Sequence, residues 1–290
     1  MHKKNTAFDV FNHFILLLFA FICVYPFYFL IIYSLSDSIE AARAPIWLLP
    51  RSFTIQSYAK LLLRKEIVNA AFISASRAVA GTVVTVFFSA MFAYLLTKRE
   101  LVFRRLFYRM MIITMYLSAG LIPYYITMKT YGLNNNYLLY IIPGAVGPFF
   151  VILVKTYIEG LPISLEEAAK IDGAGYLMIF LRIILPVCTP VLAAIAVFSA
   201  VGQWNSWQDN FYLVRSRSLK TLQLQLLEYL QTMDSTLISD VNTAAQKAGQ
   251  VSSLSIKTTI SVITMIPIML VYPFLQKYFI KGILIGSIKG

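Results

Sequence analysis

The sequence is poor in the residues from which most catalytic and metal sites are built. Of its 290 residues, two are histidine, two are cysteine and 13 are acidic. Cys23 and Cys188 fall in apolar segments without a histidine cluster nearby, so a disulfide framework is not expected. Signature motifs for P-loop nucleotide binding, zinc proteases and serine hydrolases are missing as well. We therefore expect no catalytic and no metal-binding residue in this chain.

A long polar block is also missing, and with it the room for a separate soluble domain of about 100–150 residues. The composition is 59% hydrophobic and 13% charged, and the mean hydropathy is +0.72. Several continuously apolar runs approach the roughly 20 residues that cross about 30 Å of hydrocarbon, which favours helices over a barrel. The sequence predicts an all-α membrane protein of one domain, residues 1–290, with about six transmembrane helices at roughly 13–35, 70–97, 107–128, 137–157, 183–203 and 259–280.

The positive charges predict the orientation of these spans. The net charge is +12, but no basic block is interleaved with aromatic residues, so nucleic acid is not an expected partner. Basic residues crowd the turn after the second span and precede the first span, which places both in the cytoplasm. An even number of spans returns the C-terminus to the same side. Residues 204–257 then form an extracytoplasmic lobe, expected to be helical, and "TIQSYAKLLLRK" in the first outer loop is expected to be an amphipathic segment at the membrane surface.

Charged residues within the apolar runs are nearly absent, and this bears on the class of transport. An ion or proton relay across a membrane usually needs acidic or basic side chains at membrane depth. Inverted repeats of the kind found in many secondary transporters are not evident either. A stand-alone secondary carrier is therefore the weaker alternative, and a membrane-embedded enzyme lacks a catalytic set.

The stretch "PISLEEAAKIDGAGYLMIFLRIILPVCTP", residues 162–190, is the exception in this apolar chain. Ser164 followed by Glu167 predicts a capping box that opens a short helix, and Glu166 and Lys170 are spaced to interact on one face of it. Gly173 predicts the left-handed residue that ends the helix. The alanines leave a small-residue face on which the cleft of a partner could close. The alternative is an interfacial helix that only turns the chain between two spans.

The same residues carry a resemblance to a known family. Glu167-Ala168-Ala169, Gly173, Ile183 and Leu185-Pro186 fill the positions of the EAA signature. The chain resembles the permease subunits of bacterial ABC importers, in the maltose-type carbohydrate branch. Its ending "KYFIKGILIGSIKG" is similar to the tail of the oligosaccharide and polysaccharide subgroup, some members of which import alginate.

The resemblance implies a type I ABC importer permease fold in the bacterial inner membrane, with both termini cytoplasmic. It also implies that residues 160–182 are cytoplasmic coupling helices that dock on ATPase subunits. The ATPase-coupling residues would be Glu166, Glu167, Ala168, Ala169, Lys170, Asp172 and Gly173. The implied partners are a second, homologous permease, two ATPase subunits that hold ATP and Mg²⁺, and an extracytoplasmic solute-binding protein. No cofactor is expected in this chain itself.

Candidates for the substrate path are aromatic residues close to neutral polar groups, the combination that sugar sites use. Tyr116, Ser118 and Tyr124 lie on a span that Pro123 could kink, and ordinary helix packing is the alternative. A second cluster lies at the outer mouth, where interfacial anchoring is the alternative: Trp204, Asn205, Trp207, Gln208, Asp209 and Asn210. "IIPGAVGPF" predicts a break in the fourth span. Basic residues of the lobe are compatible with an acidic polysaccharide such as alginate: Arg215, Arg217 and Lys220.

Overall fold

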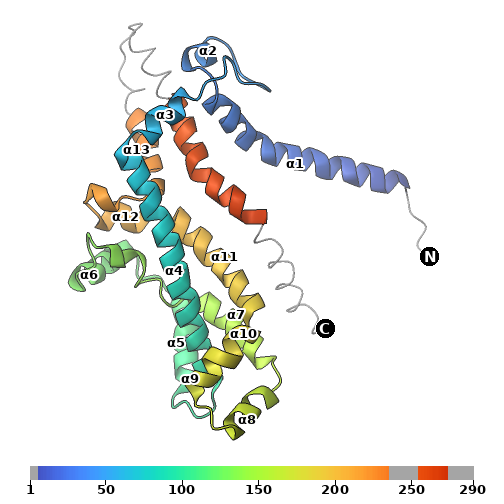
Figure 1. The fold of residues 1–290 in the computed structure, drawn as a ribbon, viewed down its shortest axis with the longest axis vertical. Coiled ribbons are helices and arrows are strands. Elements are labelled where there is room, and N and C mark those ends of the chain that lie inside the picture. The colour runs from blue at the N-terminus through green and yellow to red at the C-terminus, as the bar shows by residue number, and fades with distance from the viewer. Residues whose placement is uncertain (1–5, 235–253, 274–290) are drawn as a thin grey trace. The chain divides into compact units, whose positions relative to one another are not determined.

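The computed structural model describes residues 6–234 and 254–273, and these residues are almost entirely helical (Figure 1). The only β pairing in the described ranges is an isolated bridge between Ser36 and Phe53. The predicted all-α fold is therefore confirmed. The chain divides into two compact units, Met1–Ile67 with Leu226–Pro267 and Val68–Gln225 with Ile268–Gly290, which are described separately.

The first unit contains three of the N-terminal helices: α1 (Thr6–Ser34), α2 (Ser38–Arg43) and α3 (Gln56–Leu62). Asp37 caps α2, because its Oδ1 accepts hydrogen bonds from the N–H groups of Ile39 and Glu40 at 2.9 and 3.2 Å. The predicted amphipathic segment is α3, which buries Leu61 and exposes Leu62. The helix Leu254–Pro273 lies largely in this unit and is apolar and long enough to span a membrane.

The second unit is built on α4 (Lys65–Thr97), which begins in the first unit. The core of the second unit is the apolar packing of α4 with α5 (Arg104–Tyr116), α7 (Pro148–Glu159) and the segment from Ile179 to Ile195. Within it α7 contacts both α5 and α11 (Thr189–Asn205). The predicted lobe contributes α12 (Gln208–Leu213), a short 3₁₀ turn at Arg217–Leu219 and α13 (Leu222–Asp234), which continues into the first unit. Residues 235–253 of that lobe lie outside the described residues.

The third predicted span, 107–128, is not one helix. It ends as α5 at Tyr116, and α6 (Leu121–Thr130) starts after a break that contains Gly120 at φ +78°. Pro123 explains the place of the break. At the third position of α6 its missing N–H costs nothing, whereas in a continuous helix its ring would clash with the carbonyl four residues earlier.

The fourth predicted span, 137–157, is interrupted where "IIPGAVGPF" predicted a break. A 3₁₀ turn at Tyr137–Tyr140 is followed by irregular backbone up to α7, which starts at Pro148. Hydroxyl groups of α4 satisfy this backbone: Thr85 Oγ1 donates to the Gly144 carbonyl at 2.7 Å, and the Gly147 N–H donates to Ser89 Oγ at 3.0 Å. Irregular backbone is tolerated at membrane depth when protein groups replace water in this way.

Replacing Thr85 with valine is expected to lower the free energy of unfolding by about 0.5–1.5 kcal/mol, because the Gly144 carbonyl loses its hydrogen-bond partner. The matched control is Thr82→Val on the same helix. Thr82 Oγ1 is buried and has no hydrogen-bond partner among the described residues, so this change should be neutral or slightly stabilising. Thermal unfolding of both purified variants in detergent is the measurement. Equal losses for the two valines would contradict the role given to Thr85.

The fifth predicted span, 183–203, belongs to a strongly bent pair of helices. The run Tyr176–Val187, which includes a π-helical turn at Phe180–Ile184, meets α11 at 81°. Pro186 and Pro190 flank the corner and remove hydrogen bonds that a straight helix needs. By length and composition, three described helices could cross a membrane, or five if each bent pair counts as one span. The prediction of six spans stays a prediction, and its last span, 259–280, runs beyond the described residues.

Candidate functional site

The short helix predicted in the EAA stretch is α8 (Ser164–Ile171), and it ends in a Schellman motif. The Ala174 N–H donates to the Ala169 carbonyl at 2.9 Å and the Gly173 N–H to the Lys170 carbonyl at 3.0 Å. Gly173 has a φ of +79°, the left-handed conformation that the sequence predicted. The prediction of a capping box was wrong. The helix starts at Ser164 itself, Ile163 occupies the N-cap position, and no side chain caps the N-terminus.

The face that α8 presents to solvent is more apolar than the sequence predicted. Ala169 is buried in the core of the second unit, so only Ala168 of the two alanines is exposed. Ile171 is 87% exposed, and Ile163 and Leu177 are also largely exposed. Glu167 and Lys170 of α8 and Asp172 after it are exposed as well, so the charge of this surface is mixed, with one more acidic than basic residue. The protrusion formed by α8 and the turn after it thus exposes apolar side chains beside charged ones.

A partly buried ion pair links α8 to the end of α4. Lys98 Nζ donates to Glu166 Oε2 and lies 3.9 Å from the centroid of the Tyr94 ring. The i, i+4 interaction expected between Glu166 and Lys170 is replaced by this pair, and Lys170 lies over the Tyr176 ring instead. Burial lowers the pKa of Lys98, while its hydrogen bond to Glu166 acts in the opposite direction. The pair connects α8 to the residue that follows α4.

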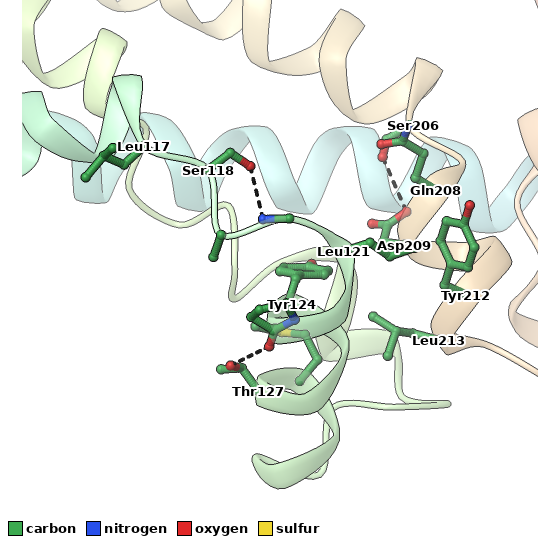
Figure 2. Close-up of a pocket in the computed structure, with 14 residues that line it drawn as sticks. Leu117, Ser118, Leu121, Tyr124, Thr127, Ser206, Gln208, Asp209, Tyr212 and Leu213 are labelled. Carbon is green, nitrogen blue, oxygen red and sulfur yellow. Dashed lines mark hydrogen bonds between the residues drawn. The ribbon is translucent and has the colours of Figure 1, made fainter.

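The second candidate site is a cavity of about 820 Å³ at the other end of the second unit, a volume in the range of small-molecule sites. Figure 2 shows it between the segment from Leu117 to Thr127 and the segment from Ser206 to Leu213. Its lining combines apolar side chains with tyrosines, hydroxyls, one amide and one carboxylate. The polar lining residues are Ser118, Tyr124, Thr127, Ser206, Gln208, Asp209 and Tyr212.

Four residues of the two predicted clusters line this cavity: Ser118, Tyr124, Gln208 and Asp209. Tyr116, although 83% exposed, is not among the lining residues, nor are Trp204, Asn205 and Trp207. The Trp207 ring instead packs edge-on against Phe211, with centroids 6.0 Å apart. The break before α6 is what opens the cavity, because the residues of the break, from Leu117 to Gly120, form one of its walls.

The carboxylate of the cavity is held by a residue that the sequence analysis missed. Arg77 of α4 is only 4% exposed and contacts Asp209 twice, at 3.1 Å from Nη1 to Oδ1 and at 2.5 Å from Nη2 to Oδ2. Its Nε donates to Gln203 Oε1 at 2.9 Å, and Nη1 also donates to the Ser206 carbonyl at 3.3 Å. The guanidinium group lies 4.6 Å from the centroid of the Tyr140 ring. One buried cation therefore fastens the junction of α11 and α12 to α4.

Gln203 of this network occupies space that glycines leave open. A Cβ atom at Gly81 of α4 would lie 2.7 Å from the Gln203 amide, and one at Gly144 would lie 3.4 Å from it. The expectation that charge is nearly absent from the spans overlooked the single arginine in the run 70–97. A lone charge inside an apolar run is itself a sign of function, so the sequence did contain a signal for Arg77.

Comparisons with known proteins agree with this architecture. Residues 85–285 match the family described as "Binding-protein-dependent transport system inner membrane component". The chain is 34% identical to the polygalacturonan/rhamnogalacturonan transport system permease protein YtcP of Bacillus subtilis (strain 168), over 99% of this chain and 100% of that protein. It is 35% identical to protein LplC of the same organism, over 99% of this chain and 97% of that one.

A solved structure shows the same fold. It is the crystal structure of a bacterial ABC transporter involved in the import of the acidic polysaccharide alginate. One of its chains matches with a TM-score of 0.85 at 29% identity, covering 96% of this chain and 99% of that one. With the family model matching over two thirds of its length, the chain belongs to the inner membrane components of binding-protein-dependent transport systems, the permeases of ABC importers.

Proposed function

We propose that this permease forms half of the translocation path of an ATP-driven importer for oligosaccharides, and that α8 is its docking element for an ATPase subunit. The observation that carries the proposal is the exposed protrusion of α8 and the turn after it. Apolar side chains as exposed as Ile171 are unfavourable in water and are typical of a surface that a partner covers. The ion pair between Lys98 and Glu166 gives such a partner a connection to α4.

The partners follow from the family and from the relatives. A second permease of the same family would complete the path, with N- and C-termini of both chains in the cytoplasm. Two ATPase subunits would bind ATP and Mg²⁺, and a solute-binding protein would deliver the substrate from outside. Arg77 does not favour a secondary carrier, because Asp209 neutralises it in a bidentate pair and leaves no free charge for a proton relay.

The substrate is proposed to be an acidic oligosaccharide that passes the cavity around Tyr124 and Asp209. Tyrosine rings and neutral hydrogen-bonding groups suit a sugar, and the pair with Arg77 keeps the Asp209 carboxylate from repelling an anion. Arg215 and Arg217 are exposed and follow soon after the last lining residue, Leu213. The relatives named for polygalacturonan and alginate transport support this choice.

Reconstitution tests the proposal. The chain is expressed with its operon neighbours, purified by a tag on this chain alone, and placed in proteoliposomes. A P-loop ATPase and a second permease should co-purify, and uptake of a labelled uronate oligosaccharide should require both ATP and the solute-binding protein. Full uptake by the chain alone would overturn the importer assignment. Preferred uptake of a neutral oligosaccharide would overturn only the choice of an acidic substrate.

A further inference from the structure

The connection from α2 to α3 contains an exposed apolar tip in the first unit. The segment "APIWLLP", residues 44–50, ends in proline and presents Trp47, Leu48 and Leu49 to the surroundings. These three side chains are 66%, 65% and 76% exposed. A soluble loop would place polar residues in such positions, so this tip needs a partner that is itself apolar.

The base of the loop is fixed at the C-terminal end of α1. The Asp37 N–H donates to the Arg51 carbonyl at 3.0 Å, and the Thr54 N–H donates to the Leu35 carbonyl at 2.9 Å. These bonds hold the C-terminal side of the loop, Arg51 to Thr54, against the residues between α1 and α2, just beyond the last residue of α1, Ser34.

From this base the tip turns back along α1. Tyr25 donates its hydroxyl proton to the Trp47 carbonyl at 3.2 Å, and Tyr28 donates to the Leu48 carbonyl. The two tyrosines precede Ser34 by nine and six residues. At a rise of 1.5 Å per residue, the tip therefore contacts α1 about 13 and 9 Å before the helix ends.

The depth of these contacts matters because α1 is a membrane span. Phe8–Ser34 has a mean hydropathy of 2.7, and only 6% of its most apolar part is buried within the protein. Tyr25 and Tyr28 lie inside its continuous apolar run from Phe14 to Tyr33. At that level water cannot satisfy the carbonyls of the tip, and unsatisfied carbonyls are costly in hydrocarbon. The tyrosine hydroxyls supply the donors that water does not.

We propose that the apolar tip, Trp47, Leu48 and Leu49, inserts into the lipid bilayer beside α1, in the leaflet that the C-terminal half of α1 crosses. Its partner is the acyl-chain region next to the phospholipid headgroups, and tryptophan is enriched near that boundary. Lipid is favoured over a protein partner because the tip is continuous with the exposed apolar surface of α1 and lies at the same depth. This anchor goes beyond the proposed import function and does not depend on the substrate.

Thiol labelling of the whole importer in proteoliposomes tests the anchor. Leu49→Cys is compared with Ile39→Cys, a matched aliphatic position on α2 that is 57% exposed and lies beyond the end of α1. A membrane-impermeant maleimide is supplied on both sides, and labelling is read for each peptide by mass spectrometry. The thiol introduced at position 49 should react about tenfold more slowly or less, because polar reagents are scarce in the acyl region. Equal rates would overturn the proposal.

Two further outcomes separate lipid from the alternatives. Combining Leu49→Cys with Tyr25→Phe and Tyr28→Phe removes both donors and should raise the labelling rate about tenfold, since two hydrogen bonds no longer hold the tip. An unchanged rate would contradict the role of the tyrosines. Protection that arises only after the solute-binding protein is added would identify a protein contact, and the lipid proposal would then be wrong.

Discussion

Replacing Arg77 with methionine is expected to abolish uptake and to lower the free energy of unfolding by about 3–5 kcal/mol. The Asp209 side chain is 13% exposed, and its carboxylate would lose both of its contacts with the guanidinium group. Gln203 and the Ser206 carbonyl would lose a donor at the same time. Thermal unfolding in detergent and ATP-dependent uptake in proteoliposomes are the two measurements.

Two controls separate the effect of losing the ion pair from the effect of losing side-chain volume. Combining Arg77→Met with Asp209→Leu leaves no unpaired charge and should recover most of the stability, so the two losses should be far from additive. Arg77→Lys keeps the charge but cannot bind Asp209 and Gln203 together, and an intermediate stability is expected. A double variant that is as unstable as the sum of the single changes would show that the pair is not coupled.

Replacing Gly173 with valine is expected to reduce uptake at least about tenfold while the permease still inserts and assembles. A β-branched residue in the left-handed conformation is strained by roughly 1–2 kcal/mol, and relief of this strain would open the Schellman motif that ends α8. No atom lies within 4 Å of a Cβ built on Gly173, so the effect comes from the backbone and not from a clash with neighbours. ATP hydrolysis and uptake are measured on the same proteoliposomes, and hydrolysis without uptake is the expected result.

Gly175 provides the matched control, because it is two residues away and also has open space around its Cβ position. Its φ is −72°, which any residue adopts, so Gly175→Val should keep normal coupling. Gly173→Asn should keep most of the activity, since asparagine tolerates the left-handed region. Equal effects of valine at both glycines would contradict the argument from backbone conformation.

Features that depend on nearby residues were predictable from the sequence. Gly173 ends its helix as expected, because only a glycine or asparagine fits that turn at low cost. The break at residues 141–147 follows from its prolines and glycines. The capping box failed although its residues are present, because Ile163 adopts helical angles and occupies the cap position ahead of Ser164. Capping depends on the path of the preceding chain, and Pro162 sets that path in three dimensions.

The candidate sites were predictable only in part, because they join residues far apart in the chain. Glu166 has a suitable partner four residues away in Lys170, yet it pairs with Lys98 of another helix. The cavity joins Ser118 and Tyr124 of one predicted cluster to Asp209 of the other, and the charge of Asp209 is balanced by Arg77, which was not predicted. No pattern of neighbouring residues in the sequence predicts such pairings. The single charge of Arg77 within an apolar run was the one sequence feature that indicated this part of the site.

The close fit of Gln203 against Gly81 has a consequence for how the permease can move. The Gln203 side chain lies against Gly81, and the bonds from Arg77 to Gln203 and Asp209 link α4 to α11 and α12. We expect these helices and α12 to move together when the permease changes state. During alternating access, the chain would bend at the two places where its helices are already interrupted. These are the break at residues 117–120 and the corner between Val187 and Thr189.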